Sequence, residues 1–215
     1  VVNLKNVDKA YGSRSIYSDF SFLIRRRERW CVMGVNVAGK STLLLQASYN
    51  YRERGMRTAI FIASFDDRAG QGRISSRIGL TSDAIAFDHT DDLFRHIEVL
   101  NGDGEGKIAC VFVDEAQFLD EEQAWQLARV ADRLNIPVMC YGLRTDFQTR
   151  LFPGSRRLME VADTIQEIKT ICDCGAKATV NARIDGDGHI ITQGAQVVLG
   201  GNDSYIAMCH KCYIR

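Results

Sequence analysis

The chain has 215 residues, enough for one large globular domain or for one domain with a small appendage. Lysine plus arginine and aspartate plus glutamate both number 27, so no net charge indicates nucleic acid or an anionic membrane as a partner. No apolar stretch approaches the roughly 18 residues that a membrane-spanning helix needs, and the first residues lack the apolar core of a secretory signal. We therefore expect a cytoplasmic protein whose seven cysteines are thiols or metal ligands rather than disulfides.

A phosphate-binding loop is the first motif along the chain. The apolar run at 30–33 predicts a buried strand, residues 34–41 match GxxxxGKS, and helix-forming residues follow from 42. The loop consists of Gly34, Val35, Asn36, Val37, Ala38, Gly39, Lys40 and Ser41. Its backbone N–H groups and the N-terminus of the following helix would surround an anion, Lys40 would reach the β- and γ-phosphates, and the Ser41 hydroxyl would bind Mg²⁺. The motif predicts binding of a nucleoside triphosphate.

Further apolar, β-branched runs alternate with helical segments. Strands are predicted at 58–63, 108–113 and 138–142, and a surface turn at 102–106. A helix is predicted from a capping box at Asp120 to about residue 134, before Pro137. Continuous apolar strands separated by helices predict an α/β fold, in which helices cover both faces of a parallel sheet of the P-loop NTPase type.

The strand at 108–113 ends in the acidic pair Asp114-Glu115. In a P-loop protein, an aspartate at a strand tip holds Mg²⁺, and the adjacent glutamate can orient a nucleophile. That nucleophile is water in an ATPase, or a substrate hydroxyl in a kinase. The alternative is an ordinary exposed acidic pair, and the motif alone does not separate a kinase from a hydrolase.

Two cysteine pairs near the C-terminus have the spacing of zinc knuckles. The ligands predicted for a structural, four-coordinate Zn²⁺ are Cys172, Cys174, Cys209 and Cys212, with His210 as a substitute for a neighbouring thiolate and four free thiols as the alternative. Around these pairs, from about residue 169, short strands and glycine turns indicate a second, zinc-ribbon-like domain. The remaining cysteines, Cys31, Cys110 and Cys140, fall in predicted strands and are expected in the core.

From about residue 38 onward, the chain resembles the thymidine kinases of bacteria and of the animal cytosol. The matching stretches include Ala38 to Thr42, Val113 to Phe118, Tyr141 to Phe147 and Val197 to Asn202. The resemblance implies transfer of the γ-phosphoryl group of ATP to the 5′-hydroxyl of thymidine, with Mg²⁺ and a structural Zn²⁺. It also suggests a homotetramer, and neither nucleic acid nor a membrane as a partner.

The resemblance also implies site residues. Those near the nucleotide are the loop 34–41 together with Asp66, Asp67, Arg68, Asp114, Glu115, Ala116 and Gln117. Lys40, Arg68 and Glu115 would be catalytic, with Arg68 steadying the phosphoryl charge and Glu115 as general base. Those near thymidine are Phe118, Phe147, Gln196, Val197, Val198, Leu199, Gly200 and Tyr205, where core packing is an equal alternative for either phenylalanine. The zinc knuckles would hold the ends of the loop that covers thymidine.

The first 29 residues do not fit this family and resemble the opening of an ABC-type ATPase. There, the aromatic residue matching Tyr11 stacks on adenine, and the loop usually carries a glycine where this chain has Val37. We therefore expect a β-structured extension at 1–29, a kinase domain at 30–168, and a zinc-binding domain with the thymidine-closing loop at 169–215. A P-loop ATPase of ABC or DExx type is the competing function, although no LSGGQ-like signature occurs downstream. A nucleic-acid-binding zinc ribbon ranks last, because residues 193–213 hold one lysine and no arginine.

Overall fold

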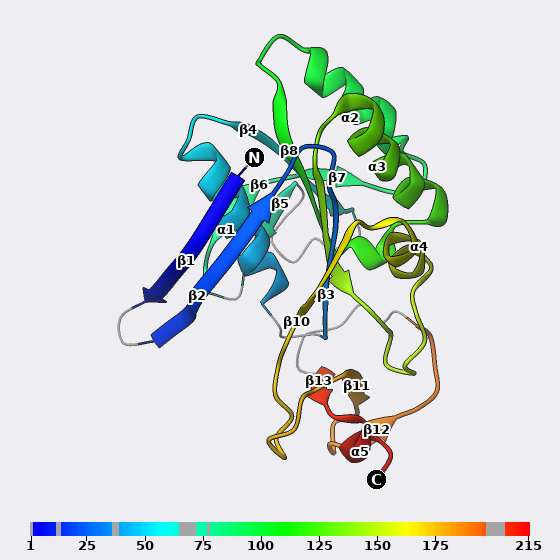
Figure 1. Ribbon diagram of the computed structural model, residues 1–215. Coiled ribbons are helices and arrows are strands. Elements are labelled where there is room, and N and C mark those ends of the chain that lie inside the picture. Colours follow the sequence, from blue (N-terminus) through cyan, green and yellow to red (C-terminus); the bar gives the residue numbers. More distant parts are fainter. Residues whose placement is uncertain (1, 12–13, 36–38, 65–71, 77, 197–204) are drawn as a thin grey trace.

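A six-stranded, entirely parallel sheet forms the centre of the molecule, in a computed structural model (Figure 1). The structure describes residues 2–11, 14–35, 39–64, 72–76, 78–196 and 205–215, with side chains from residue 24 onward. The strand order is β10-β3-β9-β8-β4-β7. The strands are β3 (Arg29–Gly34), β4 (Arg57–Ala63), β7 (Ile85–Phe87), β8 (Ile108–Asp114), β9 (Val138–Leu143) and β10 (Thr164–Ile168).

Helices cover both faces of this sheet. Helix α1 (Lys40–Arg52) packs on one face, while α2 (Leu93–Gly102), α3 (Glu121–Leu134) and α4 (Pro153–Val161) pack on the other. Along β3, Cys31 and Met33 face the three helices and Val32 faces α1, so successive side chains enter two different cores. This arrangement explains the continuous apolar runs in the sequence and confirms the predicted α/β fold.

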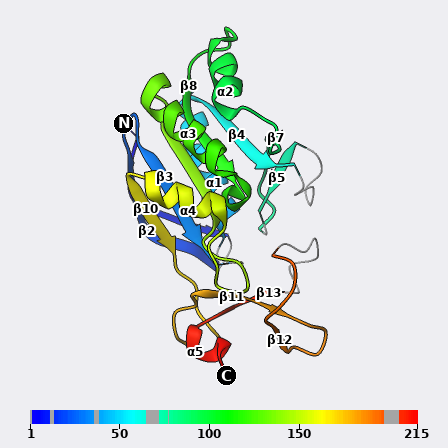
Figure 2. The ribbon, with the colours of Figure 1, turned by 90° about the vertical axis from the view of Figure 1, so that its right-hand side faces the viewer.

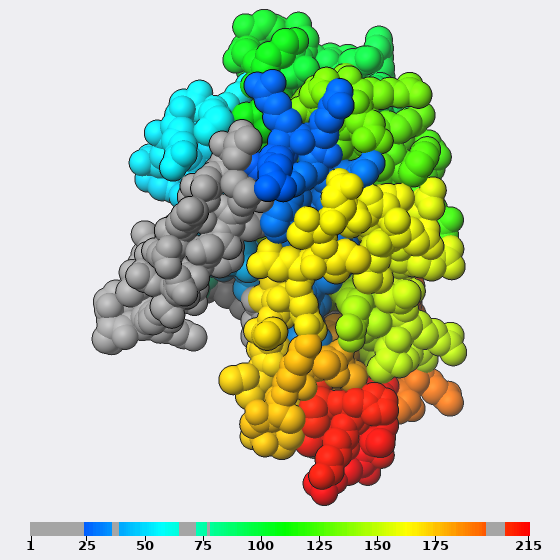
Figure 3. All heavy atoms as spheres, viewed as in Figure 1, coloured from blue at the N-terminus to red at the C-terminus, as the bar shows by residue number. Residues whose placement is uncertain are grey.

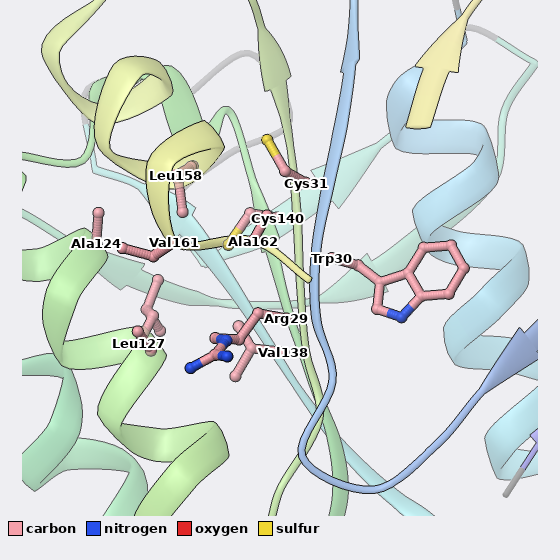
Figure 4. Close-up of a pocket in the computed structure, with 11 residues that line it drawn as sticks. Arg29, Trp30, Cys31, Ala124, Leu127, Val138, Cys140, Leu158, Val161 and Ala162 are labelled. Carbon is pink, nitrogen blue, oxygen red and sulfur yellow. The ribbon is translucent and has the colours of Figure 1, made fainter. Parts of the chain in front are cut away.

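The cysteines of the central strands are core residues, as predicted. Cys31, Cys110 and Cys140 are each at most 2% exposed. Burial raises the pKa of all three thiols, for Cys31 to about 12. Figure 4 shows Cys31 and Cys140 beside Leu158 of α4, around a cavity of about 10 Å³ that is barely large enough for one water molecule.

The predicted strands at 30–33, 58–63, 108–113 and 138–142 are all present, and α3 begins with the predicted capping box. The sequence analysis did not identify α2, α4, β7 or β10. Strand β10 was hard to recognise because it lies at the sheet edge, where exposed Ile165 and Glu167 alternate with half-buried residues. Asp92 caps the N-terminus of short α2, where its side chain accepts a hydrogen bond from the Arg95 N–H.

Smaller elements surround the sheet. Strands β1 (Val2–Tyr11) and β2 (Arg14–Ile24) form an antiparallel hairpin, as do β5 (Arg73–Ser75) and β6 (Thr81–Asp83). A C-terminal module contains β11 (Val180–Ile184), β12 (Ile190–Ile191), β13 (Tyr205–Met208) and helix α5 (His210–Tyr213). It forms a lobe below the sheet, on the side that the end of β10 faces (Figures 2 and 3). Within the described residues, no helix is long and apolar enough to cross a membrane.

Candidate functional site

The phosphate loop joins β3 to α1, at the edge where parallel strands end. Gly34 is the last residue of β3, and α1 begins at Lys40, directly after Gly39. Gly39 has φ 74°, a left-handed conformation that a side chain would strain. Lys40 is 7% exposed and its Nζ donates a hydrogen bond to the Val35 carbonyl oxygen at 3.2 Å. The ammonium group therefore lies beside Val35, directly after the end of β3.

Asp114 lies at the tip of β8 and meets the helix that follows the loop. The Ser41 Oγ donates a hydrogen bond to Asp114 Oδ2 at 2.7 Å, which links the first turn of α1 to the end of β8. Asp114 is 2% exposed, and its Oδ1 is a buried oxygen without a hydrogen-bond partner among the described residues. Burial, and then the negative charge of Glu115, raise the pKa of Asp114 to about 7, against the Ser41 hydroxyl and the charge of Lys40. A buried carboxylate oxygen with no donor beside a serine hydroxyl suits an oxygen-liganded cation such as Mg²⁺.

Glu115 follows in a conformation that is unusual for a residue with a side chain. Its φ is 49° and its ψ is 39°, in the left-handed region, and it precedes the short 3-10 helix η1 (Ala116–Phe118). Such strain clusters at functional sites and persists only where the surroundings enforce it. The Gln117 Nε2 donates a hydrogen bond to Glu115 Oε2 at 2.5 Å. Gln117, expected near ATP, is 2% exposed and Ala116 is fully buried, so both support the strand tip from inside the fold.

The two phenylalanines expected near thymidine differ in their surroundings. Phe118 is half-buried and meets Phe152 edge-to-face, with ring centroids 6.0 Å apart. Phe147 is 1% exposed, and the Arg183 guanidinium lies 4.0 Å from its ring centroid. One face of Phe147 is therefore occupied by protein, which favours the packing alternative for this residue more than for Phe118.

The chain that enters the expected thymidine loop is anchored to the loop after β9 and to β11. Gln196 Nε2 donates a hydrogen bond to buried Asp146 Oδ2 at 2.9 Å. Arg183 donates to the carbonyl oxygens of Ala195 and Gln193, at 3.1 and 3.2 Å. Tyr205, at the other end, begins β13 and is half-buried. The sequence analysis did not identify Asp146 and Arg183 as anchors, because their burial appears only in the folded chain.

The four predicted cysteine ligands come together. The Sγ atoms of Cys172, Cys174, Cys209 and Cys212 all lie within 4.8 Å of one another, and the Sγ atoms of Cys174 and Cys209 are 3.6 Å apart. A tetrahedron of sulfurs at about 2.3 Å from Zn²⁺ has edges of about 3.8 Å, so the cluster fits this ion. A hydrogen bond from the backbone of Cys209, with others from Cys174, lowers the pKa of the Cys172 thiol to about 7, which favours a thiolate.

This cluster also touches the phosphate loop, which the sequence did not indicate. Val35, 8% exposed, belongs to the same apolar cluster as Cys172, Ala178 and Cys209. The C-terminal module thus packs against the residue whose carbonyl oxygen holds Lys40. Residues 36–38, the triplet 66–68 and the segment 197–200, which include further expected site residues, lie outside the described part of the chain.

Comparison with known proteins agrees with this geometry. The family model described as thymidine kinase matches residues 30–213. A thymidine kinase of Rhizobium meliloti is 67% identical over 174 residues, which cover 81% of this chain and 89% of the relative. Thymidine kinases of Agrobacterium fabrum and Photobacterium profundum are 59% and 54% identical, each covering 82% of this chain and 91% of the relative. The chain therefore belongs to the thymidine kinase family.

Proposed function

We propose that the protein transfers the γ-phosphoryl group of ATP to the 5′-hydroxyl of thymidine, giving dTMP and ADP. The observation that carries this function is the array of Ser41, Asp114 and Glu115, which share one sheet edge with Lys40. Family membership identifies the nucleoside, because the array alone would also serve an ATPase.

In this proposal, each residue of the site has a separate role in phosphoryl transfer. Ser41 and Asp114 would hold Mg²⁺, and the ion would supply positive charge to neutralise the phosphate oxygens. Lys40 leaves the Val35 carbonyl oxygen for the phosphates, and Arg68 steadies the charge that develops on the transferred group. Glu115 accepts the proton of the 5′-hydroxyl while the bond from O5′ to the γ-phosphorus forms and the bond from that phosphorus to the β,γ-bridging oxygen breaks.

The other expected roles stay part of the proposal. Loop residues 34–41, with 66–68, surround ATP, while Phe118, Phe147 and the segment 196–200 with Tyr205 form the thymidine side. The Gln196 bond to Asp146 supports this placement, since it ties the start of that segment to the loop that follows β9. Structural Zn²⁺ on the cysteine cluster would stabilise the module that carries the segment.

The proposal also covers the domain limits, the assembly and the cellular location of the protein. We keep the division into 1–29, 30–168 and 169–215, a homotetramer, a cytoplasmic location, and no membrane or nucleic-acid partner. The likeness of residues 1–29 to an ABC-type ATPase stays a hypothesis, and the family match begins only at residue 30.

The test is ADP release from Mg²⁺-ATP with and without thymidine, together with direct detection of dTMP. We expect turnover only with thymidine, because the nucleophile that Glu115 activates in this proposal is the nucleoside hydroxyl and not water. Glu115→Gln should lower the transfer rate by about 10²–10⁴-fold and spare ATP binding, since it removes the proton acceptor and keeps the shape. Glu122→Gln, on an exposed side chain of α3, is the matched control. Steady ATP hydrolysis that ignores thymidine, without dTMP, would refute the proposal.

A further inference from the structure

Gln117 connects the tips of two strands of the sheet. Its Nε2 donates to Glu115 Oε2 at 2.5 Å, after β8, and its Oε1 accepts from the Leu143 N–H at 2.9 Å, at the end of β9. The side chain is 2% exposed. Both ends of the amide therefore bond to protein. The nucleotide contact expected from the sequence stays a prediction.

The orientation of this amide is determined by chemistry. A backbone N–H can only donate, so the Leu143 N–H requires the amide oxygen on its side. The amide nitrogen must then face Glu115, where an ionised carboxylate can only accept. The Leu143 N–H of β9 thus determines that Gln117 presents its amide nitrogen, a donor, to the Glu115 carboxylate.

The space around Gln117 leaves it little freedom. A Cβ added at Gly142 would lie 2.9 Å from Gln117 Oε1 and 3.0 Å from its backbone nitrogen. On the other side, Ser155 Oγ donates to the Leu143 carbonyl oxygen at 2.6 Å, which fixes the same stretch of β9. A side chain at position 142 would therefore have to displace Gln117.

From this geometry we propose that Gln117 is a positioning residue that holds the Glu115 carboxylate for proton transfer. Gln117 is itself held by the Leu143 N–H at the end of β9. The inference rests on the proposed role of Glu115 as general base. Glu115 is in a strained backbone conformation, so its side chain depends on neighbours for direction. A misplacement of about 1 Å can lower a rate by about 100-fold, so the amide bond should affect kcat and leave ATP binding unchanged.

Two substitutions remove the amide donor that faces Glu115. Gln117→Glu keeps an oxygen for the Leu143 N–H but loses the donor to Glu115, whereas Gln117→Met keeps only the volume. We expect both to lower kcat by about 10–100-fold with little change in KM for ATP. Gly142→Ala, which displaces Gln117 from outside, should have the same effect and serves if a Gln117 variant does not fold. Gln126→Met is the matched control, because buried Gln126 also accepts from a backbone N–H, that of Leu93, away from the site.

The decisive measurement is a double-mutant cycle on single-turnover transfer. In a Glu115→Gln background, Gln117→Met should lower the rate little further, because the group that it positions is gone. An equal loss in both backgrounds, or full kcat in both Gln117 variants beside an inactive Glu115→Gln, would overturn the inference alone. Full transfer by Glu115→Gln would instead refute the proposed base, and the inference with it.

Discussion

Replacing Asp114 by asparagine should make the ligand-free protein more stable at high pH and inactive. The pKa of this buried carboxyl rises from 3.8 to about 7, first through burial and then through the charge of Glu115. A raised pKa means that the folded state resists ionisation. The cost is absent below pH 4, grows as the pH rises from about 4 to about 7, and is complete above that range.

The magnitude follows from that shift. About three pKa units at about 1.4 kcal/mol each give a cost on the order of 4 kcal/mol at pH 8, of which less than half is already present at pH 5. Asparagine carries no charge, so its advantage over aspartate should grow by about 2–3 kcal/mol between pH 5 and pH 8. Placing an amide beside the Ser41 hydroxyl has a pH-independent cost. That cost is equal at both pH values, so it drops out of the change between pH 5 and pH 8.

Urea unfolding at both pH values measures this difference, without Mg²⁺ or nucleotide. A chelator must be avoided, since it would strip metal from the cysteine cluster. Asp83→Asn, at a 99% exposed side chain, is the control and should show no such pH dependence. An Asp114→Asn advantage that stays constant from pH 5 to pH 8 would refute the argument, as would a wild type that is the more stable protein at pH 8.

Three further changes test the packing, the metal and the N-terminus. Gly154→Ala would place a Cβ 2.3 Å from a backbone carbonyl oxygen, and should cost about 1–3 kcal/mol in urea unfolding, whereas Gly102→Ala, in open space, should be nearly neutral. Cys209→Ser should remove bound zinc, as measured by metal analysis. It should also raise KM for ATP as well as for thymidine, because Val35 of the phosphate loop packs on the cysteine cluster. An unchanged KM for ATP would contradict this coupling of the cluster to the phosphate loop. Deleting residues 1–23 should leave kcat largely intact, and a loss of ATP affinity above about tenfold would instead give the hairpin a nucleotide-binding role.

Local motifs identified much of this molecule before its structure was known. The phosphate loop, the Asp114-Glu115 pair and the cysteine pairs were visible because their chemistry requires particular residue types at short spacing. Continuous apolar runs predicted the central strands, since a strand buried on both faces has no polar side to show. Edge strand β10 and helix α4 were missed because their half-exposed patterns resemble those of loops.

Other features depend on contacts between residues far apart in the sequence. The Ser41 bond to Asp114 spans 73 positions, and only the parallel sheet brings both to one edge. Burial in that setting changes the pKa of Asp114, and no local pattern encodes burial. The role of Gln117 likewise depends on β9, whose Leu143 N–H orients the amide from 26 positions away. The sequence determined which chemical groups are present, whereas tertiary packing decided their partners, because hydrogen bonding and desolvation depend on distance in space.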